Sequence, residues 1–219
     1  MGAATQGAPR PTTNLLLSGV GGQGVVLASY VLSQVAMAEG YDVKQSEVHG
    51  MSQRGGSVTS HFRFGDNVAA PLVTPGTADI LLGFEALEAL RYVHWLRPGG
   101  LLIYNCQQIN PSPVAAGLAS YPADIDAQIA AAWPLVRRVD ANALAQEAGT
   151  VKAANIVMLG AVSGALPFAP ETWETVIRRV VPPKTVDVNL NAFRLGIAGR
   201  TTNVNGAASS TGDPVLTLP

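Results

Sequence analysis

The chain has 219 residues, of which 47% are hydrophobic and only 13% are charged, and its net charge is −1. This length fits one α/β domain with a well-buried core. The low share of charged residues favours a surface partly covered by another subunit over an ordinary alanine-rich small domain. Because no basic stripe is present, we do not expect nucleic-acid binding.

The cysteine and histidine content argues against metal chemistry within this chain. Cys106 is the only cysteine, so a disulfide framework and a cysteine-ligated zinc or iron–sulfur site are excluded. The histidines at 49, 61 and 94 do not have metal-ligand spacing, and no metal site is predicted. The sequence has no secretory signal and no apolar run long enough to span a membrane, so the predicted location is cytoplasmic.

The first elements form the opening unit of a nucleotide-binding type of α/β fold. Residues 1–13, rich in Gly, Ala, Pro and Thr, are expected to be a disordered leader. An apolar strand around residues 15–17 leads into a glycine-dense turn, and a long apolar helix is predicted over residues 25–38. A short second strand follows at residues 42–46, which completes a strand–turn–helix–strand unit.

The rest of the pattern predicts a Rossmann-like α/β fold. Residues 57–64 form a strand by pattern, and residues 68–73 are expected to pair back on it as a hairpin. The later expected elements are strands at 78–83, 101–105 and 136–139 and helices at 85–96, 123–133, 141–148, 156–166, 171–181 and 186–199. This alternation predicts a mostly parallel sheet flanked by helices, with the hairpin as an excursion. Residues 200–219 are expected to be a flexible tail.

The glycine turn is the first candidate ligand site. Its cofactor-binding candidates are Gly19, Gly21, Gly22, Gln23 and Gly24. Glycines at this spacing let backbone amides approach a pyrophosphate at a helix N-terminus. A dinucleotide site also needs an acid at the end of the second strand, but Asp42 starts that strand and Glu47 continues into a loop of its own. Three interpretations stay open: a nicotinamide or flavin dinucleotide, another phosphate or pyrophosphate, and a purely structural turn.

A polar, glycine-bracketed loop after the second strand is the second candidate site. Its candidate residues for contact with substrate or partner are Glu47, His49, Ser52, Gln53, Arg54, Gly55 and Gly56. Polar loops at the carboxyl ends of strands line the crevice in which α/β proteins bind ligands. Arg54 is suited to hold a phosphate or a carboxylate through two parallel hydrogen bonds. The alternative is a solvated loop without a ligand.

The two motifs together identify a family. GVGGQGV (residues 19–25) and SEVHGMSQRGGSV (residues 46–58) resemble the gamma-type domain of the 2-oxoacid:ferredoxin oxidoreductases, nearest to the small beta subunits of the branch that acts on indolepyruvate. Further matches are ADILLGFEALEALR (78–91), LRPGG (96–100), ANIVMLGA (154–161) and NLNAF (189–193). The resemblance covers residues 14–199, and the second-loop motif is its most specific part.

The resemblance implies a reaction and a distribution of its cofactors between two kinds of subunit. The family oxidatively decarboxylates a 2-oxoacid, here an arylpyruvate such as indolepyruvate, with coenzyme A to give acyl-CoA, CO2 and reduced ferredoxin. Thiamine diphosphate, Mg²⁺ and [4Fe-4S] clusters are implied on a large alpha subunit, in an (αβ)2 or higher heteromer. This chain is then a non-redox subunit that holds no cofactor alone and supplies no catalytic residue. Its single cysteine and its lack of an acidic Mg²⁺-pyrophosphate motif agree with this.

The turn and the loop are expected to line one crevice that faces the active site of the large subunit. In this hypothesis the phosphates of coenzyme A meet the amides of Gly21 to Gly24, Arg54 holds a phosphate or a partner carboxylate, and His49 is a hydrogen-bonded structural residue. Two other classes stay open: a stand-alone dinucleotide-dependent oxidoreductase and a purely structural subunit. The sequence leaves open which 2-oxoacid is used and whether the electron acceptor is ferredoxin or a nicotinamide.

Overall fold

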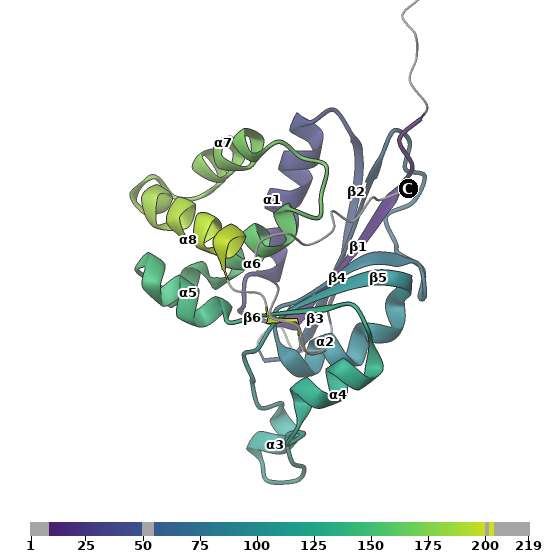
Figure 1. Ribbon diagram of the computed structural model, residues 1–219, viewed down its shortest axis with the longest axis vertical. Helices are drawn as coiled ribbons and strands as arrows, with labels where there is room; N and C mark the ends of the chain where they lie inside the picture. Colours follow the sequence, from purple (N-terminus) through teal and green to yellow (C-terminus); the bar gives the residue numbers. More distant parts are fainter. Residues whose placement is uncertain (1–8, 50–54, 200–201, 204–219) are drawn as a thin grey trace, which may run out of the picture.

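The central feature of the fold is a single mixed sheet (Figure 1). The computed structural model describes residues 9–49 and 55–199, and the backbone of residues 202–203. In this part of the chain seven strands form one sheet in the order β2-β3-β1-β4-β5-β6-β7. The strands are β1 (Thr13–Val20), β2 (Asp42–His49), β3 (Ser57–Gly65), β4 (Ala78–Gly83), β5 (Leu96–Asn105), β6 (Val136–Val139) and β7 (Thr202–Asn203).

The predicted Rossmann-like α/β class is confirmed by the strand directions. β1, β4, β5 and β6 run parallel to one another, whereas β3 pairs antiparallel with both β1 and β2. β1 and β2 therefore run in the same direction but are separated by β3. The chain leaves β1 toward one side of the sheet and returns in β4 on the other, which makes the β1–β4 junction a topological switch point.

The hairpin predicted between residues 57–64 and 68–73 does not form, although residues 57–65 are a strand. Residues 66–77 form no strand. β3 instead pairs with β2 along one edge, from Asp42 opposite Gly65 to His49 opposite Val58, and with β1 along its other edge. Because both edges of β3 are occupied, residues 68–73 have no strand to join. They bury Val68 and Val73 against the domain instead.

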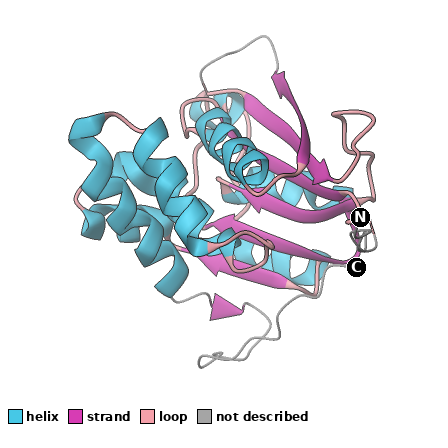
Figure 2. Ribbon diagram, turned by 90° about the horizontal axis from the view of Figure 1, so that it is seen from above, coloured by secondary structure: helices cyan, strands magenta, loops and turns pink. Residues whose placement is uncertain are grey.

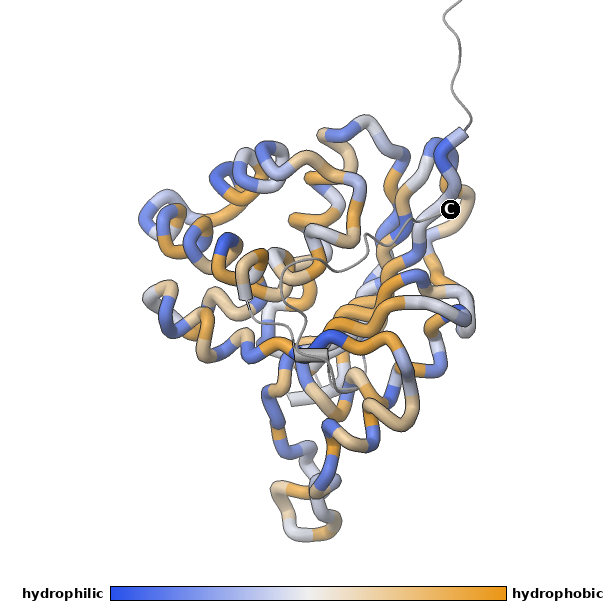
Figure 3. Tube along the Cα trace, viewed as in Figure 1, coloured by the Kyte–Doolittle hydropathy of each residue, from blue (hydrophilic) through white to orange (hydrophobic). Residues whose placement is uncertain are grey.

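Helices cover both faces of the sheet and enclose two hydrophobic cores (Figure 2). The helices are α1 (Val25–Ala38), α2 (Ala86–Tyr92), α3 (Ser112–Ala115), α4 (Ile125–Ala132), α5 (Ala141–Ala148), α6 (Ala154–Ser163), α7 (Pro170–Val180) and α8 (Val186–Ala198). The larger core lies under α1 and α5–α8, and the smaller core lies under α2 and α4. Figure 3 shows the apolar central strands between these layers. No helix among the described residues has the length and apolar composition needed to cross a membrane.

Local signals set several helix ends. Asp140 caps α5 as predicted, because its side chain accepts a hydrogen bond from Ala143 N at 3.0 Å. The helix expected over residues 85–96 is shorter: α2 ends at Tyr92, a 3₁₀ turn follows at Val93–Trp95, and Leu96 already begins β5.

The ends of the domain differ from the expected boundaries. Thr13 begins β1, and the guanidinium of Arg10 forms an ion pair with Asp66 at 2.6 Å and lies 3.8 Å from the centre of the Tyr41 ring. The described structure therefore includes the last part of the predicted leader, whose residues 1–8 lie outside the description. In the predicted tail, residues 202–203 form β7 beside β6, and the other residues of 200–219 lie outside the described part.

The crossing of α6 and α8 depends on two glycines. A Cβ atom at Gly160 would collide with the backbone of Phe193, and one at Gly196 would collide with the backbone of Val157. The two helix backbones are therefore in direct contact, which only glycine at these positions allows.

We expect Gly160→Ala to lower the free energy of unfolding by about 1–3 kcal/mol, the usual cost of overpacking a core. The measurement is urea unfolding of the purified chain. Gly164→Ala is the matched control, because a Cβ there meets nothing within 4 Å. Equal midpoints for the two variants would contradict this packing.

Candidate functional site

The glycine turn joins β1 to α1 through two residues with positive φ. Gly22 has φ of 106° and Gly24, the residue before the helix, has φ of 79°. At Gly24 a Cβ would also lie 2.6 Å from Nδ2 of Asn155, a buried residue at the start of α6. Both conformation and close approach therefore require glycine at position 24.

The side chain of Gln23 stabilises the turn through three hydrogen bonds. Its Oε1 accepts a hydrogen bond from Val20 N at 2.7 Å, and its Nε2 donates to Phe84 O at 2.7 Å and to Gln107 Oε1 at 2.9 Å. These bonds tie together the ends of β1, β4 and β5. Both polar atoms of the Gln23 carboxamide thus serve the fold, so its predicted role as a ligand contact has no support from this geometry.

The structure brings the turn and the second loop together, as the sequence predicts. Gly21 N donates to Gly56 O at 2.9 Å, and Gly55 N donates to Gly21 O at 3.4 Å. Gln23 N is also used, because it donates to Val20 O at 3.1 Å. The expected row of amides from 21 to 24 is therefore reduced to Gly22 and Gly24.

The remaining predicted loop residues are only partly described. Glu47 and His49 lie at the exposed end of β2, and Gly55 and Gly56 lie against the turn. The segment that holds Ser52, Gln53 and Arg54, residues 50–54, lies outside the described residues, so their roles stay predictions.

A groove of about 730 Å³ lies on the α1 side of the turn. It is lined by Val20, Gly21, Gly22, Gly24, Val25, Val26, Leu27, Tyr30, Gln45, Glu47, His49 and Val58. We call it the α1–β2 groove. Its walls are mostly apolar, and Glu47 is the one carboxylate among the described residues that line it.

A second, more polar cleft of about 380 Å³ lies on the other side of the turn, at the carboxyl ends of β1, β4 and β5. Its polar lining comprises Gln23, Asn105, Gln107, Asn142, Lys152 and Asn155, beside Gly21 and Gly22. We call it the switch-point cleft, because it lies where open α/β sheets bind ligands. Carboxamide donors and one ammonium group suit an anion.

Sequence reasoning missed the polar residues of the switch-point cleft. Asn105 ends β5, where its Nδ2 donates to Phe84 O at 3.3 Å and to Asn142 Oδ1 at 3.1 Å. A polar residue at the carboxyl end of a predicted buried strand was the available signal. Asn142 and Lys152 had no such signal, because they are brought to the cleft by helices and turns more than thirty residues later.

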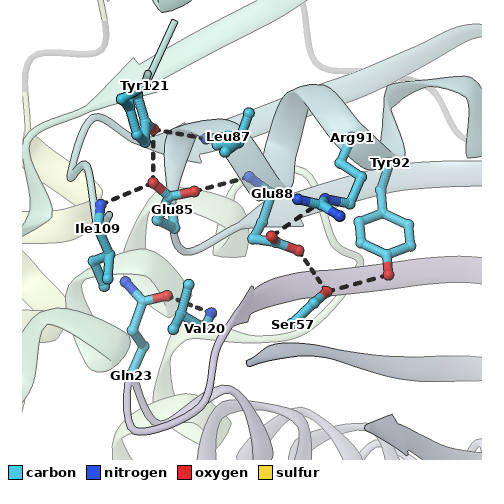
Figure 4. Close-up of polar contacts among 10 residues, drawn as sticks. All are labelled: Val20, Gln23, Ser57, Glu85, Leu87, Glu88, Arg91, Tyr92, Ile109 and Tyr121. Atoms are coloured by element: carbon cyan, nitrogen blue, oxygen red, sulfur yellow. Dashed lines mark hydrogen bonds and ion pairs between the residues drawn. The ribbon is translucent and has the colours of Figure 1, made fainter. Parts of the chain in front are cut away.

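Glu88 of α2 holds the end of the loop (Figure 4). Ser57, the first residue of β3, donates to Glu88 Oε2 at 2.5 Å and lies 3.2 Å from the Tyr92 hydroxyl. The Glu88 side chain is buried and its charged partner is Arg91, at 3.3 Å. Burial raises the pKa of Glu88 above its ordinary value.

Glu85, the residue before α2, binds the 107–121 connection to the same helix. One of its carboxylate oxygens caps α2 by accepting from Glu88 N at 2.8 Å. The other accepts from Tyr121 OH at 2.7 Å and from Ile109 N at 3.0 Å. Burial and the Glu85 carboxylate both raise the pKa of Tyr121. The loop end and the 107–121 connection are therefore positioned by one helix.

His61 of β3 packs beneath the 68–73 segment. Its Nδ1 accepts a hydrogen bond from Val73 N at 3.2 Å, and burial lowers its pKa. A ring nitrogen that accepts this bond is deprotonated, so His61 Nδ1 serves the packing of the 68–73 segment.

The class of protein follows from comparison with known families. The chain matches the family described as pyruvate ferredoxin/flavodoxin oxidoreductase over residues 14–199. The chain belongs to this family of oxidoreductase subunits, and the resemblance drawn from the two motifs is confirmed.

Particular relatives narrow the class. The chain is 43% identical over 196 residues to indolepyruvate oxidoreductase subunit IorB of Thermococcus kodakarensis, covering 84% of this chain and 94% of that protein. It is 44% identical over 189 residues to the IorB subunit of Pyrococcus horikoshii, with the same coverage. The crystal structure of the keto/oxoacid ferredoxin oxidoreductase gamma subunit of Geobacter sulfurreducens has the same fold, with a TM-score of 0.63, 23% identity and coverage of 85% and 96%.

The raised pKa of Glu88 predicts a pH-dependent contribution to stability. The folded state binds the Glu88 proton more tightly than the unfolded state, so this contribution is complete below the ordinary pKa of 4.5 and is lost as pH rises through the higher folded value. Glu88→Gln keeps an acceptor for Ser57 without the buried charge. We expect its urea midpoint to exceed that of the unmodified chain at about pH 8, with a gap that narrows toward about pH 4.

Glu147→Gln, on the exposed side of α5, is the matched control and should show no such gap. If the unmodified chain were the more stable at about pH 8, or if the gap did not change with pH, the burial argument for Glu88 would be wrong.

Proposed function

We propose that this chain is the small, non-redox subunit of a 2-oxoacid:ferredoxin oxidoreductase that acts on an arylpyruvate such as indolepyruvate. The complex would convert the oxoacid and coenzyme A to acyl-CoA and CO2 and reduce ferredoxin. The observation that carries the proposal is the match to indolepyruvate oxidoreductase subunits of nearly the same length. The fold of the gamma-type subunits agrees with it.

The redox chemistry belongs to the larger partner in this proposal. Thiamine diphosphate supplies the decarboxylation chemistry, and [4Fe-4S] clusters carry the electrons, with Mg²⁺ holding the diphosphate. Cys106, the only cysteine of this chain, cannot hold a cluster by itself. The (αβ)2 assembly and the cytoplasmic location are parts of the same proposal.

The contribution of this chain is to hold the anionic part of coenzyme A. The switch-point cleft supports this role, because its ammonium group and carboxamides face the free amide of Gly22 beside the start of α1. In the proposal Lys152, Gln107 and Asn142 contact phosphate oxygens. Arg54, which lies outside the described residues, is proposed as a further phosphate contact.

The stand-alone dinucleotide-binding alternative is disfavoured by strand order. A dinucleotide site takes its ribose-binding acid from the strand next to β1. Here β3 occupies that position, and Glu47 lies one strand further away, opposite Ser60. The carboxylate is therefore about two strand spacings, roughly 10 Å, from β1 in the plane of the sheet.

The test is to replace Arg54 and Lys152 separately by Ala in the co-expressed complex. Each loses a charge-assisted contact of ~1.5–3 kcal/mol, so we expect the KM for coenzyme A to rise roughly ten- to hundredfold. The measurement is acyl-CoA formation from indolepyruvate over a range of coenzyme A concentrations. The yield of assembled complex should stay unchanged.

Arg178→Ala, an exposed arginine on α7, is the matched control. Unchanged turnover and KM in both variants would support a purely structural subunit instead. Losses of turnover that merely follow losses of assembly would contradict the ligand role as well.

A further inference from the structure

The α1–β2 groove collects part of the exposed apolar surface. Among the described residues nine large hydrophobic side chains are exposed, and three of them line the groove. Met37 also lies on α1, whereas Val48 lies on the opposite face of β2 from Glu47. Tyr30, which is 48% exposed, lies on the groove wall with Val26 and Leu27. Figure 1 shows α1 alongside the β2–β3 hairpin. Such a gathering indicates a surface that another molecule covers.

β2 is an edge strand that can accept a further strand. It pairs with β3 on one side, and no strand among the described residues lies on the other. The strand is eight residues long and contains no proline. Its one lysine, Lys44, would guard such an edge, but its charge is paired with Asp42 at 2.6 Å. The edge is therefore open to backbone pairing of the kind used in peptide recognition.

The groove and the switch-point cleft have charges of opposite sign. Within the described residues no lysine or arginine lines the groove, and the carboxylate of Glu47 accepts a hydrogen bond from Gln45 Nε2 at 3.4 Å. The switch-point cleft carries Lys152 instead. An anionic ligand is thus attracted to the cleft, whereas the groove favours an apolar side chain accompanied by a cation.

We propose that the α1–β2 groove is the docking site for an extended, basic segment of the larger partner subunit. The segment adds a strand to the free edge of β2, places an apolar side chain against Tyr30 and Val26, and sets a lysine or arginine opposite Glu47. This inference rests on the proposed function, because it needs the larger subunit.

A second copy of this chain does not supply the same complement. Twofold antiparallel pairing of β2 with itself places residues of the same sheet face opposite each other. Glu47 shares its face with Val43, Gln45 and His49, and Lys44 lies on the other face. The lysine of a second copy therefore cannot face Glu47.

The test measures how tightly the free small chain binds the purified larger subunit. We expect Tyr30→Asp and Glu47→Lys each to weaken this association at least about tenfold, the size of one well-placed interface contact. Both side chains are exposed, so the melting temperature of the free chain should not change. Hydrogen exchange of the β2 amides should slow when the complex forms.

Two matched controls separate docking from general surface effects. Leu118→Asp changes the most exposed large hydrophobic side chain, 83% accessible, which lies far from α1. Glu147→Lys reverses an exposed charge on α5. Neither should weaken the association.

Each other outcome overturns the inference. Association and β2 exchange that are unchanged in the variants would show that the segment docks elsewhere. A change only in self-association of the small chain would assign the groove to a second copy, and a change only in a small-molecule KM would assign it to a ligand. If the unmodified chain binds no larger subunit, the proposed function fails too. If it does, and Tyr30→Asp binds equally well, the docking site alone is wrong.

Discussion

The structure depends on the backbone clamp between the glycine turn and the end of the β2–β3 loop. Gly21 exchanges hydrogen bonds with Gly55 and Gly56, and Gln23 ties the same turn to the ends of β4 and β5. The glycine turn is thereby bonded to the last glycines of the second motif. The clamp therefore joins the carboxyl end of β1 to the residues that lead into β3.

This clamp divides the ligand-facing surface into two regions of different chemistry. On one side lies a polar cleft with an ammonium group and several carboxamides, and on the other an apolar groove with a carboxylate. A chain without redox groups can assist a redox enzyme through such a division, because it can hold an anionic cosubstrate on one side and the redox subunit on the other. Glu88 of α2 and its N-cap residue Glu85 hold Ser57 and the 107–121 connection against the same helix.

Much of the fold could be predicted because its signals are local. Short stretches of sequence are enough to predict the glycine turn, α1, the Asp140 cap and the alternation of strands and helices. The partner of β3 could not be predicted in this way, because pairing with β1 and β2 is decided by burial of Phe62 and Phe64 in the core rather than by the turn at residues 65–67. The local pattern predicted a strand at residues 68–73, but in the folded protein both edges of β3 are already paired, so these residues have no strand to pair with.

The candidate site, like the fold, could be predicted only in part from the sequence. The motif residues Gly21, Gly55 and Gly56 meet as expected, because both motifs follow the carboxyl ends of strands. Gln23 was assigned to a ligand, whereas its carboxamide is used within the fold. Lys152 and Asn142 were missed because only the packing of α5 and α6 against the sheet brings them to the cleft.

The most direct test of the account is to isolate the tagged chain from its native cells and to weigh and analyse what accompanies it. The account predicts a larger, brown partner that carries iron and thiamine diphosphate, in equal numbers with this chain. Recovery of the small chain alone, with a nicotinamide or flavin nucleotide bound to it, would contradict the account and make it an independent dinucleotide-binding protein.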